Sequence, residues 1–187
     1  HLNMRAFLIL VLVVFFASCN DEVTVKPSAM LRLEYPEPVY TNATTGCPYT
    51  FDKNAISNVS VKQNCAVNLE YPSINATLYL TYQPVRGNNL DSLLYDAQKL
   101  TYEHNIKAQA IFEQPRVDSI NNVYGMFYAI DGNAATQSQF YVTDSVNHFV
   151  QGSLYFNVKP NYDSIYPAVM YLRNDIRRVM ETISWKE

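Results

Sequence analysis

The sequence predicts an α+β protein, a single domain with a mostly antiparallel sheet and helices packed on the faces of that sheet. Two observations carry this prediction. Residues 123–158 hold three apolar or alternating segments separated by short turns, which is typical of an antiparallel meander. Residues 89–104 and 163–184 repeat apolar side chains at helical spacing, so each is expected to form an amphipathic helix.

The first expected strands are short. Residues 31–36 and 67–72 both end in Leu-Glu-Tyr-Pro, and proline closes a hydrogen-bonded ladder because it has no N–H. Residues 76–82 alternate strictly, with Leu78 and Leu80 toward one face and threonine or tyrosine toward the other. A period of two predicts a strand here as well.

A helix is expected from about residue 89 to residue 104, after the break at Gly87-Asn88-Asn89. Asn88 or Asn89 can serve as its N-cap, and the carboxylate of Asp91 is favourable near the positive end of a helix. Two further strands are expected over residues 108–112 and 116–120.

The meander follows, with strands expected over residues 123–130, 137–143 and 148–158. Both alternating sets of the first strand are apolar or aromatic. We therefore expect this strand to be central in the sheet, with layers covering both of its faces. The turns at Asp131-Gly132-Asn133 and at residues 144–147 set the antiparallel order.

The last expected element is a helix that Asp163 caps and that runs to about Ser184. Its apolar stripe includes Val169, Leu172 and Ile176. Pro167 is compatible with this helix because it is expected in the first turn, where the missing N–H has no partner to lose. The ring of Trp185 is expected to pack against the helix end.

Composition limits the classes of function. The chain has 187 residues, of which 48% are hydrophobic, enough for one domain with a buried core and too many for a disordered chain. Its formal net charge of −3 argues against nucleic-acid binding driven by neutralised phosphates. The 15 tyrosines suit half-buried strands and contact surfaces, because each buries a ring and keeps a hydroxyl for water.

The N-terminal residues resemble a bacterial lipoprotein signal. Met4 is the expected start, Arg5 supplies a positive charge, and residues 6–17 form an apolar run too short to cross a bilayer. The run ends in Phe16-Ala17-Ser18-Cys19, which has the order of a lipobox. The alternative is ordinary secretory cleavage near Ala17-Ser18 with an incidental cysteine.

These residues predict three parts of the chain. Residues 1–18 are a signal peptide, Cys19 is acylated after cleavage, residues 19–30 are a lipid-anchored tether, and residues 31–187 are a single α+β domain. No second apolar stretch approaches the length needed to span a membrane.

Cys47 and Cys65 then remain as one pair in a compartment that permits disulfides. The loop that they close is about 18 residues long, for which chain entropy gives roughly 3 kcal/mol. The alternative is a reactive or metal-binding thiol pair. It is disfavoured because the spacing lacks Cys-x-x-Cys and no histidine lies nearby, so we predict a structural disulfide.

No residue pattern predicts a catalytic or metal centre. The sequence has no nucleophile elbow, P-loop or dinucleotide-binding motif, and neither His104 nor His148 has a second histidine at helical spacing. Glu103 with His104, or Glu34 with Glu70, are the only acid/base candidates. The simpler interpretations are a helix end with a histidine near the last carbonyls, and solvated edge charges.

The remaining polar residues are candidates for recognition. His148 is expected to be an exposed side chain at the edge of a turn. Residues 132–139 carry amide and hydroxyl groups that are able to bind a peptide or glycan, although a solvated hairpin has the same sequence pattern.

Several segments together resemble the gliding-motility lipoprotein family GldD of Bacteroidetes. They are residues 31–36, 69–84, 96–104, 124–128, 132–144, 148–156 and 175–185. With the lipobox, the resemblance covers essentially the whole mature chain. It implies a role in gliding and in the type IX secretion apparatus, with the integral-membrane protein GldE as partner. It transfers one residue, Cys19, as the lipid site, and no catalytic residue. The order of elements also resembles the Mog1/PsbP-like fold.

The resulting hypothesis is a non-enzymatic, lipid-anchored envelope protein that supports gliding and type IX secretion through protein–protein contacts. We expect its palmitate-bearing anchor in the outer membrane, with the periplasmic face of the inner membrane as the alternative. No cofactor, metal or nucleic acid is expected. The alternative function is an envelope hydrolase or glycan-modifying enzyme that uses Glu103 and His104, or Glu34 and Glu70.

Overall fold

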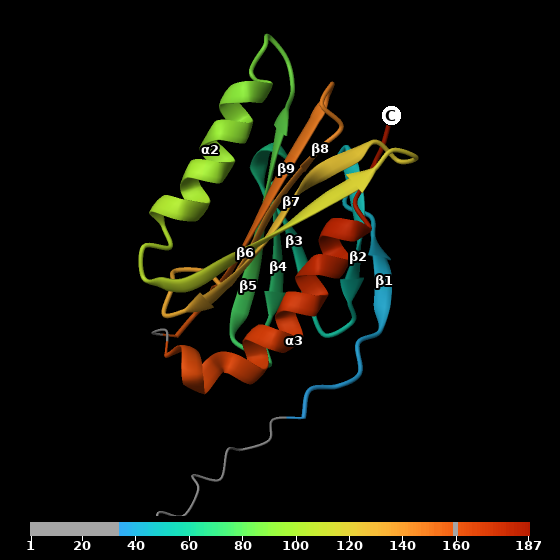
Figure 1. Ribbon diagram of the computed structural model, residues 1–187. Helices are drawn as coiled ribbons and strands as arrows, with labels where there is room; N and C mark the ends of the chain where they lie inside the picture. The colour runs from blue at the N-terminus through green and yellow to red at the C-terminus, as the bar shows by residue number, and fades with distance from the viewer. Residues whose placement is uncertain (1–33, 159–160) are drawn as a thin grey trace, which may run out of the picture. The chain divides into compact units, whose positions relative to one another are not determined.

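A computed structural model describes residues 34–158 and 161–187 of the protein. These residues form two α-helices, one short 3-10 helix, η1 (Gln63–Cys65), and ten strands in two antiparallel sheets. Residues Tyr35–Glu187 cluster as one unit. The predicted α+β class, a mostly antiparallel sheet with helices on its faces, is confirmed (Figure 1).

The larger sheet has seven strands in the order β3-β4-β5-β9-β8-β7-β6. Its strands are β3 (Asn58–Val61), β4 (Val67–Tyr71), β5 (Ala76–Pro84), β6 (Ala108–Asp118), β7 (Val123–Gly132), β8 (Ser138–Thr143) and β9 (His148–Phe156). Every pair is antiparallel, and β7, β8 and β9 form the predicted meander.

The smaller sheet was not predicted. It joins β1 (Tyr40–Ala43), β2 (Tyr49–Asn54) and β10 (Ser184–Trp185), so that residues 184–185 pair with residues 49–50, far away in the sequence. The strand predicted over residues 31–36 is wrong in its described part, because residues 34–36 form no strand. Its other residues lie outside the described ranges.

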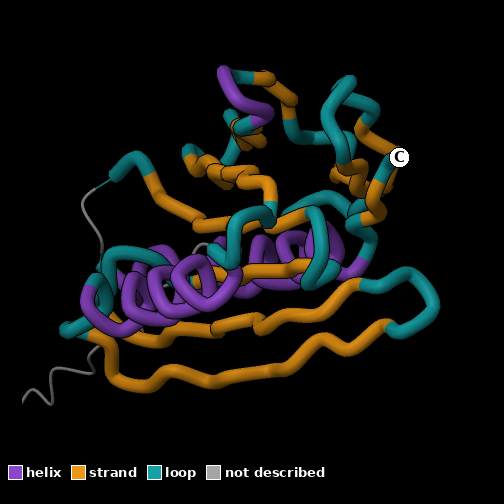
Figure 2. Tube along the Cα trace, turned by 90° about the horizontal axis from the view of Figure 1, so that it is seen from above, coloured by secondary structure: helices purple, strands orange, loops and turns teal. Residues whose placement is uncertain are grey.

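Two helices cover opposite faces of the larger sheet. Helix α3 (Tyr162–Glu181) packs on the face that carries Phe127 and Leu78, together with the smaller sheet. Helix α2 (Leu90–Glu103) packs on the face that carries Tyr128. Figure 2 shows both helices beside the β6–β7 hairpin, at the far end of the strand order from β3. Neither described helix is long and apolar enough to cross a membrane.

Two details of the larger sheet differ from expectation. The two strands expected over residues 108–112 and 116–120 are one strand, β6, which ends at Asp118, because Pro115 is tolerated on the edge strand of a sheet. Strand β7 has layers on both faces as expected, but it is second from the edge, and β9 is the central strand.

The start of α3 also differs from expectation. Its N-cap is Asn161, whose carbonyl accepts the N–H groups of Ser164 and Ile165, both at 3.1 Å. Asp163 therefore lies inside the helix, and Pro167 lies in its second turn rather than its first. At the other helix the N-cap is Asn89, whose side chain contacts Arg86 and Pro84 instead of the first helical N–H groups.

Candidate functional site: an aromatic cleft beside the disulfide

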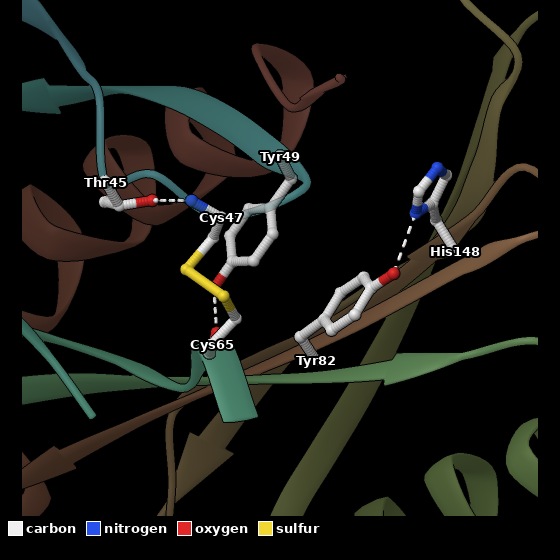
Figure 3. The surroundings of a disulfide bond; sticks show 6 residues. All are labelled: Thr45, Cys47, Tyr49, Cys65, Tyr82 and His148. Atoms are coloured by element: carbon white, nitrogen blue, oxygen red, sulfur yellow. Dashed lines mark hydrogen bonds between the residues drawn. A yellow bond between two sulfur atoms is a disulfide. The ribbon is translucent and has the colours of Figure 1, made fainter. Parts of the chain in front are cut away.

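Cys47 and Cys65 form a disulfide whose Cα atoms lie 5.6 Å apart. It joins the loop before β2 to η1, which connects β3 to β4. The fully buried Tyr49 lies beside it, and its hydroxyl donates a hydrogen bond to the Cys65 carbonyl at 2.9 Å (Figure 3). Burial raises the pKa of the Tyr49 phenol. The disulfide and this hydrogen bond both hold η1 against β2.

A row of aromatic rings continues from Tyr49 toward the surface. Tyr82 of β5 stacks on Tyr49 with centroids 5.8 Å apart, and its hydroxyl is hydrogen-bonded to Nδ1 of His148 at 2.9 Å (Figure 3). The His148 ring in turn stacks on Trp185 at 5.0 Å. These four residues come from β2, β5, β9 and β10, so the row ties the smaller sheet to the larger one.

The electrostatics around Tyr82 come from burial and from two charged neighbours. Burial raises the pKa of the Tyr82 phenol, the Asp144 carboxylate raises it further, and the guanidinium of Arg86 opposes both. A phenol is protonated at neutral pH even at its ordinary pKa, and the raised pKa extends the pH range over which the hydroxyl is able to donate a hydrogen bond.

The turn before β9 places His148 in this row. The Asp144 carboxylate accepts hydrogen bonds from the N–H groups of Val146, Asn147 and His148, at 3.0, 2.8 and 2.8 Å. Burial alone would raise the pKa of Asp144, but these bonds outweigh burial and lower it. The expectation that His148 is an exposed side chain is wrong, because its ring is half-buried against Tyr82 and Trp185.

Tyr82 lines a cleft of about 870 Å³. One wall comes from η1 and its neighbours, including Asn64, Cys65 and Ala66, and the other from residues 81–84 with Arg86. His148 and Trp185 line a second cleft of about 360 Å³. The hydrogen-bonded pair of Tyr82 and His148 therefore contributes one ring to each cleft.

The larger cleft lies where the pairing of β4 with β5 stops. β4 pairs with residues 76–80 of β5, whereas β9 pairs with all of β5 as far as Pro84. Residues 81–84 thus have a neighbouring strand on one side only among the described residues. The chain turns away at η1, where Asn64 and Cys65 both have a φ of 55°.

The predicted acid/base residues lie elsewhere. Glu103 and His104 are exposed and line a small cleft of about 330 Å³ next to Ala134. Glu103 pairs with Lys99 at 3.8 Å, and His104 is the C-cap residue of α2. In the part of the chain that the structure describes, no group of three or more histidine, cysteine or acidic side chains is arranged to hold a metal.

The other predicted site residues are placed as follows. Glu70 is exposed on β4, and Glu34 precedes the unit that begins at Tyr35, so their pairing stays a prediction. Cys19 lies outside the described residues.

The polar stretch at residues 132–139 is mostly buried, with Asn133 and Ala135 exposed. Its last four side chains, Thr136 to Gln139, are buried and point into the protein. Gln137 donates to the Ala134 carbonyl at 3.1 Å, and Gln139 donates to the Ser153 hydroxyl at 2.9 Å. The amides of Gln137 and Gln139 therefore donate within the domain.

Together, the fold and the cleft define a class: a single-domain α+β protein with an open cleft, lined in part by Tyr82, at an interrupted strand pair. The chain belongs to the gliding motility lipoprotein GldD family, whose family model matches residues 20–185. No curated protein matches it. Membership implies a role in gliding motility and a membrane-anchored place in the cell envelope.

Proposed function

We propose that this protein is a lipid-anchored envelope component that supports gliding motility and the associated type IX secretion machinery by binding another protein. In this proposal residues 1–18 are a signal peptide, Cys19 carries the palmitate-bearing anchor, and residues 19–30 are the tether to the outer membrane. The domain from residue 31 onward makes the contact and catalyses no reaction. The integral-membrane gliding protein GldE is the partner that the family resemblance suggests.

The observation that carries the proposal is the cleft beside the disulfide. Its walls are a strand edge, an aromatic ring, amides and one arginine, which are groups that recognise a polypeptide. The cysteine in the wall is in a disulfide and is not a nucleophile. Tyr82 in the cleft stacks on Tyr49, which stacks on Phe51 in the core. The cleft is therefore formed before a partner binds, and binding requires little ordering of the protein.

The anchor is tested with Cys19→Ala in cells. We expect loss of globomycin-sensitive processing and release of the protein from the membrane fraction. Cys47→Ser with Cys65→Ser is the matched control, since it also removes thiols and should leave the protein membrane-bound. A Cys19→Ala protein that stays in the membrane fraction would refute the lipid anchor.

The contact with a partner is tested by cross-linking the lipidated protein in its native envelope. Adducts with GldE or another gliding or secretion component support the proposal. The enzyme alternative is tested with Glu103→Gln and His104→Ala, which should leave gliding unchanged. Loss of gliding in both variants, with normal amounts of protein, would favour the enzyme alternative.

A further inference from the structure

We infer that the cleft beside the disulfide binds an extended, acidic peptide segment, which adds as a short strand to the open edge of β5 at Tyr82. The inference rests on the proposed function and specifies the chemistry of the partner segment. It depends on three features of the described residues: the backbone groups of β5, the way its edge is bounded, and the charge of the cleft.

The backbone groups of β5 follow from its pairing with β9. Val85 N–H donates to the Asn147 carbonyl and Asn157 N–H donates to the Asn75 carbonyl, both at 2.9 Å, and both pairs continue the β5–β9 register beyond its ends. In an antiparallel ladder, hydrogen-bonded pairs alternate with pairs whose backbone groups point away. Odd-numbered residues of β5 therefore bond to β9. The N–H and C=O of even-numbered residues point to the other edge.

This edge is open at one residue. Leu80 meets Val67, the first residue of β4. Pro84 has no N–H, and its carbonyl accepts a hydrogen bond from the Asn89 side chain at 3.1 Å. Between them, the N–H and C=O of Tyr82 have no backbone partner among the described residues. One donor and one acceptor thus face the cleft, which is the pair of groups that an added strand uses at each hydrogen-bonded position.

The walls of the cleft suit a peptide chain. Pro48, Ala66 and the Tyr82 ring give apolar surface, and Gln63, Asn64 and Gln83 offer side-chain amides. The disulfide and the hydrogen bond from Tyr49 fix the wall opposite β5. A segment that enters therefore meets a surface that is already ordered, rather than an edge free to pair with any strand.

The charge of the cleft selects an acidic segment. Arg86 is exposed, lines the cleft, and forms no ion pair with a described carboxylate. No acidic side chain is among the described residues that line this cleft. A carboxylate on the peptide, either a side chain or a C-terminus, is thus attracted and bound by the guanidinium, whereas a lysine there is repelled.

The test uses fluorescein-labelled, capped octapeptides that alternate threonine and valine, and the full lipidated protein in detergent micelles. One peptide carries two glutamates, the second carries lysines in their place, and the third is the glutamate peptide with its central amides N-methylated. Binding is measured by fluorescence anisotropy. Protein labelled with ¹⁵N-tyrosine reports on the Tyr82 amide in the same samples.

We expect saturable binding of the glutamate peptide with a shift of the Tyr82 amide. The lysine peptide should bind about tenfold more weakly or worse, and N-methylation should abolish binding because it removes the strand donors. Arg86→Glu should weaken the glutamate peptide about tenfold. Arg86→Gln is a second variant that reverses no charge, and Lys107→Glu is a control at an exposed lysine that lines another cleft.

Three results would overturn the inference: equal affinity for the glutamate and lysine peptides, undiminished binding of the N-methylated peptide, or an unchanged Tyr82 amide on binding. Concentration-dependent self-association that Arg86→Glu abolishes, without peptide binding, would assign the cleft to a second copy of the chain instead. Peptide binding in vitro with normal gliding of Arg86→Glu cells would retain the inference and refute a role for the cleft in gliding. If no peptide binds in vitro but Arg86→Glu cells lose gliding, the inference of an acidic peptide is refuted and the role of the cleft in gliding is retained.

Discussion

The two faces of the seven-stranded sheet differ in how firmly they are covered. Helix α3 buries eight of its 20 residues against one face, among them Leu172, Ile176 and Val179. Helix α2 buries only Ala97 and Thr101 of its 14 residues against the other. The smaller sheet and the disulfide also lie on the α3 face, whose apolar cluster is the larger of the two.

This difference shows that the face with the larger core is also the face from which Tyr82 reaches the cleft. The α3 face carries most of the buried apolar side chains of the two clusters, and hydrophobic free energy follows the apolar area that is buried. The same face carries the row of stacked aromatic rings. Tyr49 of this row is part of the core, and Tyr82, which stacks on it, lines the cleft. Because α2 buries few side chains, we expect it to unfold locally at a lower free energy than α3.

The largest effect is expected from truncating α3. Ile176 is fully buried, and Ile176→Ala should lower the free energy of unfolding by about 3–4 kcal/mol. Leu94 of α2 is only partly buried, and Leu94→Ala should cost about 1 kcal/mol. Urea unfolding monitored by circular dichroism measures both values. Equal costs for the two substitutions would break the comparison between the faces.

The next effect is expected at the disulfide. Cys47→Ser with Cys65→Ser should cost about 3 kcal/mol, because a loop of 18 residues is no longer closed in the unfolded chain. Hydrogen exchange should rise in η1 and β2 and remain unchanged in α2. As a control, a reducing agent should destabilise the wild type and leave the double variant unaffected. Faster exchange spread evenly over both helices would contradict a local role for the disulfide.

A pH-dependent effect is expected from Asp175, which α3 buries to 1% exposure beside Tyr40, Tyr71 and Asn54. Burial raises its pKa above the ordinary value of 3.8, against the hydrogen bond that Asn54 donates at 3.2 Å and the nearby hydroxyls of Tyr40 and Tyr71. The folded state therefore prefers the protonated acid. Its contribution to stability is greatest below the ordinary value and declines as pH rises through the raised pKa.

Asp175→Asn isolates this contribution. Asp118 and Asp144 have lowered pKa values, so they add stability as pH rises, which is opposite to the effect of Asp175. Subtracting the stability of the variant from that of the wild type cancels the contribution of these two residues. The difference should fall as pH rises between about 4 and 7, measured by urea unfolding in steps of pH. A difference that rises over this range would contradict the raised pKa.

The smallest effect is expected from the hydroxyl of Tyr82. Tyr82→Phe keeps the stacked ring and removes the hydrogen bond to His148, so it should cost about 1 kcal/mol. Tyr79→Phe is the matched control, because Tyr79 is 40% exposed on the opposite face of β5. Its cost should be close to zero in thermal unfolding. An equal loss in both variants would show that the Tyr82–His148 bond adds nothing.

The elements with a local periodicity could be predicted from the sequence. Strand β5, helix α2 and the meander all have side-chain patterns that repeat within the element, and the structure confirms them. The boundary residues of α3 could not be assigned as well, because several polar residues near residue 162 are able to cap a helix.

The smaller sheet and the cleft could not be predicted, because both depend on distant pairings. β10 has two residues, and only its register with Thr50 and Tyr49 of β2 makes it a strand. His148 looks like a turn residue until Tyr82, 66 positions earlier in the chain, is placed beside it. The open edge at Tyr82 depends on where β4 stops, which is a property of the pairing and not of either strand alone. β2 itself could have been predicted, because Tyr49 and Phe51 are apolar residues at a spacing of two, which is typical of a strand.

The central claim is that the partner binds in the cleft beside the disulfide. Site-specific photo-cross-linking in gliding cells tests it most directly, with a photoreactive residue at Gln83 in the cleft and, for comparison, at the exposed Tyr95 of α2. We predict an adduct with a gliding or secretion protein from Gln83, absent in Arg86→Glu cells, and none from Tyr95. Adducts from Tyr95 with none from Gln83 would contradict the account.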